Sequence, residues 1–193
     1  MLATRGVGCD VVLGLARGGV PVGAEIAGRL GAKLDAFVVR KLGAPLWPEL
    51  AMGAIATGGG IVVNDDVVRS LGVTDAELRD VVEVETRELS RREVAYRGAA
   101  PPPRLTDRTV LLADDGIATG ATMLAALRAV RAAGAARVIV AVPVAPSSVF
   151  DLLRGETDDV VVAVVPRRFG AVGQAYEDFR QVSDDEVRAA LKR

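Results

Sequence analysis

The chain has 193 residues, half of them hydrophobic, and its 24 basic and 25 acidic residues leave a formal net charge of −1. This length fits a single domain with a proper core. The near-zero charge argues against a broad basic surface for nucleic acid, and no apolar run approaches the roughly 20 residues that cross a bilayer. The absence of histidine and the single cysteine, Cys9, exclude Ser-His-Asp and Cys-His catalysis, cysteine zinc sites and an internal disulfide.

Apolar β-rich runs alternate with helical patterns along the chain. This alternation predicts an α/β fold in which a Rossmann-like parallel sheet is flanked by helices, within one domain that spans residues 1–193. Residues 1–6 contain no long apolar stretch of the kind found in secretory signals, so we expect a cytoplasmic location. The first elements are a strand at 11–15, a helix at 20–30 that ends at Gly31, and a strand at 34–39.

The segment Ala16-Arg17-Gly18-Gly19 lies between the first strand and the first helix. Two glycines allow backbone N–H groups to approach an anion, and Arg17 can bridge its oxygens. An ordinary glycine-rich turn is the alternative. Arg40 and Lys41 close the predicted second strand and offer two further cations, or else they are long side chains that reach solvent from a strand end.

Residues 43–64 are rich in Gly, Pro and small side chains. We predict a loop and then a hairpin with strands at 51–56 and 61–63, projecting from the sheet. Such a hairpin in a nucleotide-handling protein is a candidate lid, and an ordinary edge hairpin is the alternative. A long helix should follow, because Thr74 and Glu77 have the spacing of a capping box.

Residues 109–122, TVLLADDGIATGAT, are the most informative segment. An apolar strand would carry Asp114 and Asp115 to its carboxyl end, where open α/β sheets bind ligands. The carboxylates can accept hydrogen bonds from a ribose diol, while backbone N–H groups of 119–122 face a phosphate at the start of the next helix. The alternative is an Asp that caps a helix beside glycines that only turn the chain. The candidate ribose 5-phosphate site comprises Asp114, Asp115, Gly116, Ala118, Thr119, Gly120, Ala121 and Thr122.

The rest of the chain continues the α/β pattern. Apolar residues at 123, 127 and 130 predict a helix that stops near Gly134, strands follow at 137–142 and 160–165, and a short helix begins near 146–148. Residues 166–193 form a tail that we interpret as a small C-terminal hood with a helix at 184–191. We interpret Tyr176 and Phe179 within it as packing residues, because aromatic side chains bury large areas.

The pattern from Asp114 to Thr122 resembles the phosphoribosyl-diphosphate signature of the type I phosphoribosyltransferases: an apolar strand, two acidic residues, three variable positions and then Thr-Gly-x-Thr. The resemblance implies the type I phosphoribosyltransferase fold. It also implies an enzyme that transfers phosphoribosyl from 5-phosphoribosyl 1-diphosphate to a nitrogenous base and releases diphosphate. Asp114, Asp115 and Arg17 would be its catalytic residues.

The segment 16–19 resembles the diphosphate-binding loop of the same family, in which a basic residue precedes Gly-Gly. The resemblance implies a cis peptide between Ala16 and Arg17. It also implies that Mg²⁺ accompanies the diphosphate and is held mostly by the ligand and water, so no dedicated metal ligands are expected. The candidate diphosphate-binding residues are Ala16, Arg17, Gly18, Gly19, Arg40 and Lys41.

Two positions bear on the acceptor. In the 6-oxopurine enzymes of the family the residue before Thr-Gly is an aspartate that handles a purine proton, whereas here it is Ala118. A 6-oxopurine acceptor is therefore disfavoured, and the acceptor stays open. The segment around Phe169 is similar to the one that follows the last strand in hypoxanthine-guanine enzymes, which makes Phe169 the candidate base-stacking residue.

The expected partners are phosphoribosyl diphosphate and a base, with no nucleic acid and no membrane, and the resemblance allows a homodimer. A second hypothesis keeps the fold without the catalysis: a regulatory protein that senses phosphoribosyl diphosphate. A generic Rossmann-like nucleotide binder is disfavoured, because the first turn lacks Gly-x-Gly-x-x-Gly and the chain has no Gly-Lys-Ser/Thr phosphate loop.

Overall fold

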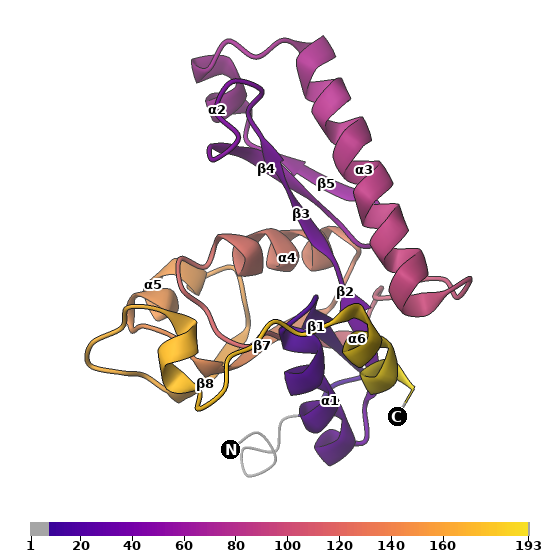
Figure 1. Ribbon diagram of the computed structural model, residues 1–193, viewed down its shortest axis with the longest axis vertical. Helices are drawn as coiled ribbons and strands as arrows, with labels where there is room; N and C mark the ends of the chain where they lie inside the picture. Colours follow the sequence, from indigo (N-terminus) through magenta and orange to yellow (C-terminus); the bar gives the residue numbers. More distant parts are fainter. Residues whose placement is uncertain (1–7, 193) are drawn as a thin grey trace.

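The computed structural model describes residues 8–192, so the N-terminal residues 1–6, on which the expectation about a secretory signal rests, lie outside it. Five parallel strands form the main sheet in the order β2-β1-β6-β7-β8 (Figure 1). This arrangement confirms the predicted α/β fold with a parallel sheet. The strands are β1 (Val11–Leu15), β2 (Lys33–Phe37), β6 (Thr109–Ala113), β7 (Arg137–Val144) and β8 (Asp159–Val164).

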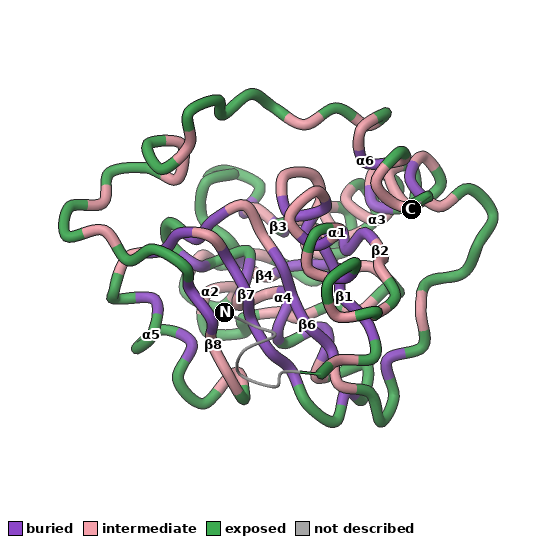
Figure 2. Tube along the Cα trace, turned by 90° about the horizontal axis from the view of Figure 1, so that it is seen from below, coloured by how far each residue is buried: buried purple, intermediate pink, exposed green. Residues whose placement is uncertain are grey.

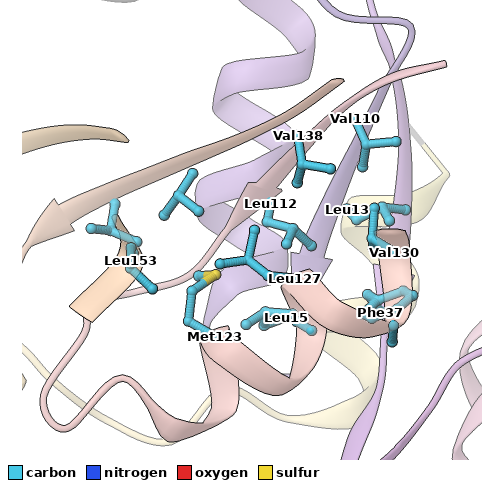
Figure 3. Packing of buried hydrophobic residues seen from close by; sticks show 14 of the residues in the cluster. Leu13, Leu15, Phe37, Val110, Leu112, Met123, Leu127, Val130, Val138 and Leu153 are labelled. Carbon is cyan, nitrogen blue, oxygen red and sulfur yellow. The ribbon is translucent and has the colours of Figure 1, made fainter. Parts of the chain in front are cut away.

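Both faces of this sheet are buried, as Figure 2 shows for its central strands. Successive side chains of a strand point to opposite faces, so β1 sends Leu13 and Leu15 to one core cluster and Val12 to another. Helix α4 (Ala121–Ala132) covers the first face and α1 (Gly19–Leu30) the second. Figure 3 shows Met123 and Leu127 of α4 among the strand residues of the first cluster.

Local signals set the ends of the helices. Helix α1 stops at Gly31, whose φ of +65° favours glycine. Helix α3 (Asp75–Arg97) begins on the predicted capping box. There the Thr74 hydroxyl accepts a hydrogen bond from the Glu77 N–H at 3.3 Å, and the Glu77 carboxylate accepts one from the Thr74 N–H at 2.9 Å.

A second, antiparallel sheet projects from the first and consists of β3 (Val39–Gly43), β4 (Ala51–Ala56) and β5 (Gly60–Val63). The strand predicted at 34–39 ends at Phe37 instead. The reason is that Val38 pairs with Thr57: its N–H donates to the Thr57 hydroxyl and its carbonyl accepts from the Thr57 N–H, both at 2.9 Å. The chain therefore leaves the main sheet before Arg40 and Lys41, which lie in β3.

Helix α4 contacts both sheets, and α3 packs along the second one (Figure 1). After β8 the chain crosses from one edge of the main sheet to the other, where α6 (Asp184–Leu191) contacts α1, α3 and β2. None of the helices in residues 8–192 has both the length and the apolar character needed to cross a membrane. The remaining short elements are α2 (Asp65–Ser70), α5 (Ser148–Leu153) and the 3-10 turn η2 (Val172–Ala175).

Candidate active site

The acidic turn, Asp114 and Asp115, follows β6 at the carboxyl edge of the main sheet, with β1 on one side and β7 on the other. Burial, and then the charge of Asp115, raise the pKa of Asp114 to about 7, and burial raises the pKa of Asp115. Neither carboxylate takes part in an ion pair within residues 8–192. Two adjacent acids without counter-charge at the ligand edge of an α/β sheet are typical of a functional site.

The loop between β1 and α1 packs directly against this acidic turn. A Cβ on Gly18 would overlap the Asp115 carboxylate, and a Cβ on Gly19 would overlap the carbonyl of Ala113 and lie 2.8 Å from the Cα of Asp114. Position 19 accepts only glycine because a Cβ there meets backbone, whereas a Cβ at position 18 would force the Asp115 side chain to move. The peptide between Ala16 and Arg17 in the same loop is cis, as the resemblance implies.

Helices α1 and α4 begin at this edge of the main sheet without a side-chain cap, as does the short helix α5, which differs in having Asp151 in its first turn. Helix α1 starts after Gly18 and α4 after Gly120, and neither carries an acidic residue in its first turn. In α1 the Val20 N–H donates to the Arg17 carbonyl at 3.1 Å and Pro21 has no N–H, so Gly19 is the one of its first three residues that keeps an N–H for another acceptor. In α4 the N–H groups that precede Leu124, which donates to the Gly120 carbonyl at 2.8 Å, are placed as at helix termini that bind anions. Helices α2, α3 and α6 begin instead on side-chain caps from Asn64, Thr74 and Ser183.

The threonine loop, residues 118–122, leads into α4 and is open to solvent. Ala118, Thr119, Ala121 and Thr122 are exposed, whereas Gly120 is buried, with a φ of +79° and Leu152 where a Cβ would be. A pocket of about 520 Å³ lies between α4 and the second sheet, and its lining contains Ala121, Thr122 and Lys41. The structure thus brings Lys41 of β3 to the threonine loop, although the two are far apart in sequence.

The two arginines of the predicted site have carboxylate partners. Nη1 of Arg17 lies 3.5 Å from Oδ1 of Asp184 in α6, and the Tyr96 hydroxyl of α3 donates to the same oxygen at 3.1 Å. Nε of Arg40 donates to Glu85 of α3 at 2.7 Å. Arg17 is therefore turned toward the C-terminal helix, and Arg40 fastens β3 to α3.

The tail between β8 and α6 reaches the acidic turn, which we did not predict. The Tyr176 hydroxyl donates to the backbone carbonyl of Asp115 at 2.5 Å. Gly116 is buried against Val172, since a Cβ there would lie 2.6 Å from the Val172 Cγ1. Phe169 is half-buried in the preceding part of the tail, and its role in stacking stays a prediction.

No group of three or more His, Cys, Asp or Glu residues that would hold a metal ion by themselves occurs in residues 8–192. The carboxylates of Asp114 and Asp115 are hard oxygen donors, and Mg²⁺ commonly binds one or two carboxylates together with phosphate oxygens and water. The donor set therefore fits a Mg²⁺ ion that arrives with a phosphorylated ligand, and does not fit a resident metal centre.

A family model described as "Phosphoribosyl transferase domain" matches residues 49–157, which is more than half of the chain. The chain belongs to this family. The part matched to the phosphoribosyl transferase domain contains the acidic turn and the threonine loop, whereas the loop at 16–19 and the tail lie outside it.

Two relatives of this phosphoribosyl transferase domain come from Mycobacterium tuberculosis, strains CDC 1551 / Oshkosh and H37Rv, and each is named "Putative phosphoribosyl transferase". Both are 49% identical over 183 residues, or 95% of this chain, and the chain spans only 41% of their length. The crystal structure of TT1426 from Thermus thermophilus is similar, with 43% identity, a TM-score of 0.85 and coverage of 98% of this chain and 90% of that one.

Proposed function

We propose that the protein transfers the 5-phosphoribosyl group from phosphoribosyl diphosphate to a nitrogenous base and releases diphosphate. One observation carries this proposal: the acidic turn and the loop at 16–19 are so close that a Cβ on Gly18 would overlap the Asp115 carboxylate. A ribose held by the acids would then present its anomeric carbon to the neighbouring loop. Sugar and leaving group would be bound side by side, as glycosyl transfer requires.

Each group has a task in this proposal. The carboxylates of Asp114 and Asp115 accept hydrogen bonds from the ribose 2- and 3-hydroxyls and lie near the positive charge that develops on the ring. The N–H groups at the start of α4, with the hydroxyls of Thr119 and Thr122, bind the 5-phosphate. The N–H groups of Gly18 and Gly19 at the start of α1 and the guanidinium of Arg17 receive the departing diphosphate.

Mg²⁺ would neutralise part of the diphosphate charge as the glycosidic bond breaks. The chain's own contribution is to accept the ion through the carboxylates of the acidic turn while phosphate oxygens and water complete its coordination. Arg40 and Lys41 were also candidates for diphosphate binding. Lys41 has the support of its place in the pocket beside the threonine loop, and its ion pair with Glu49, at 3.4 Å, is exposed. Arg40 is held instead by a half-buried ion pair with Glu85 at 2.7 Å.

The site does not identify the acceptor base, but it disfavours one class of acceptor, the 6-oxopurines. Ala118 is exposed and apolar, so it supplies no group to handle a proton on a 6-oxopurine ring. We propose that residues 43–64 act as a lid over the reacting centre and residues 166–193 as a hood, in which Phe169 stacks on the base. The partners would then be two small molecules.

Diphosphate release with Mg²⁺, measured over a panel of nitrogenous bases, tests this function. Turnover with at least one base, and no turnover after Asp114→Asn/Asp115→Asn, is the expected result. Tight binding of phosphoribosyl diphosphate with no release over the whole panel would instead favour a regulatory protein that senses this ligand.

A further inference from the structure

The tail between β8 and α6 is in atomic contact with the acidic turn. Val172 covers Gly116 so closely that any side chain at position 116 would collide with its Cγ1 at 2.6 Å and with the Cγ1 of Val144 at 2.9 Å. The tail runs from the β8 edge of the sheet toward α6 (Figure 1). It therefore crosses above the residues that we propose to hold the ribose.

Tyr176 makes the polar contact between the tail and the turn. Its hydroxyl donates to the carbonyl oxygen of Asp115 at 2.5 Å, across 61 residues of sequence. That carbonyl belongs to the peptide that follows the Asp115 Cα, so holding it restricts the backbone rotation that directs the Asp115 side chain. Burial, and then the charges of Asp115 and Asp114, raise the pKa of Tyr176 to about 12, so the phenol stays a donor at neutral pH.

The ring of Tyr176 is itself fixed by its neighbours in the tail. It packs at a tilt of 42° against Phe179, with ring centroids 5.1 Å apart, a favourable aromatic arrangement. Phe179 in turn lies against Gly173, where a Cβ would come within 2.8 Å of the ring. Phe179 is 48% exposed, so it supports the Tyr176 ring at the surface of the tail.

We propose that Tyr176 is a positioning residue for ribose binding: by holding the Asp115 carbonyl, it keeps the carboxylate aimed at the ribose hydroxyls. This inference rests on the proposed function. It goes beyond the packing role that the sequence suggested, because the hydroxyl and the ring have separate tasks. Removing only the hydroxyl should weaken binding of the ribose and leave binding of diphosphate by the loop at 16–19 unchanged.

Two partial ligands test the two parts of the proposed site separately. Ribose 5-phosphate tests the acidic turn and the threonine loop, and inorganic diphosphate with Mg²⁺ tests the loop at 16–19. For Tyr176→Phe we expect a five- to tenfold higher Kd for ribose 5-phosphate and an unchanged Kd for inorganic diphosphate. The matched control is Tyr96→Phe, which loses a phenol that donates to Asp184 instead. It should bind ribose 5-phosphate like the wild type.

Each other outcome overturns the inference. Equal ribose 5-phosphate affinity in Tyr176→Phe and wild type would leave the proposed function standing and remove the positioning role. Loss of both partial ligands in Tyr176→Phe would assign the hydroxyl to the stability of the fold as a whole. A wild-type protein that binds neither ligand would overturn the proposed function, and this inference with it.

Discussion

Asp114→Asn should stabilise the protein at alkaline pH much more than at acid pH. The pKa of Asp114 rises from its ordinary value of 3.8 to about 7 on folding, mainly through burial. Between these values the folded state holds a proton that the unfolded state has lost. The free energy of folding that the Asp114 carboxyl contributes is therefore fully present below about pH 4 and is lost as the pH rises to about 7.

The size of this stability difference follows from the shift in the pKa of Asp114. A pKa shift of this size corresponds to about 4 kcal/mol at pH 8, of which about 3 kcal/mol develops above pH 5. Asparagine has no such loss, and its side-chain oxygen can still accept the hydrogen bond that Asp115 N–H donates to Asp114 at 2.9 Å. The stability gain of Asp114→Asn at pH 8 should exceed its gain at pH 5 by about 3 kcal/mol.

Urea unfolding of the variant and the wild type at the two pH values measures this difference. Asp80→Asn, which neutralises an exposed carboxylate on α3, is the control and should show no comparable pH dependence. A variant that is equally stable relative to wild type at pH 5 and pH 8, or less stable at pH 8, would refute the reasoning that Asp114 is a buried acid without counter-charge.

Two further substitutions test the neighbouring loop. Asp184→Asn should lower the Kd for inorganic diphosphate two- to fivefold, because a half-buried ion pair at 3.5 Å, worth roughly 0.2–1 kcal/mol, no longer competes for the Arg17 guanidinium. If Asp185→Asn has the same effect, the Arg17–Asp184 pair is not the cause. Gly18→Ala should raise the Kd for ribose 5-phosphate at least tenfold, because its methyl group displaces the Asp115 carboxylate. A tenfold higher Kd corresponds to a loss of about 1.4 kcal/mol in binding free energy. Gly28→Ala, with nothing within 4 Å of the new methyl, should bind normally and gain about 0.5–1 kcal/mol in stability.

The sequence predicted the elements whose signals are local. The capping box at Thr74, the stop at Gly31 and the apolar run of β6 each depend on a few adjacent residues. Helix α2 was missed although it has a local signal: Asn64 caps it by accepting a hydrogen bond from the Val67 N–H, and two acidic residues follow in its first turn.

Long-range contacts explain what the sequence did not predict. The strand after α1 is cut short by the pairing of Val38 with Thr57, which are 19 residues apart. In the site, the acidic turn and the threonine loop were predicted because each is a continuous motif. The contact of Tyr176 with the acidic turn, and that of Arg17 with Asp184, 167 residues further along, leave no local pattern.

Calorimetric titration with phosphoribosyl diphosphate and Mg²⁺ tests the central claim most directly, comparing the wild type with Asp114→Asn/Asp115→Asn. The control is Asp75→Asn/Asp80→Asn, which neutralises two exposed acids of α3. Each charge-assisted hydrogen bond contributes about 1.5–3 kcal/mol, so the first double variant should bind at least tenfold more weakly than wild type and the control should bind normally. Equal affinity in all three proteins would contradict the claim that the acidic turn holds the ribose.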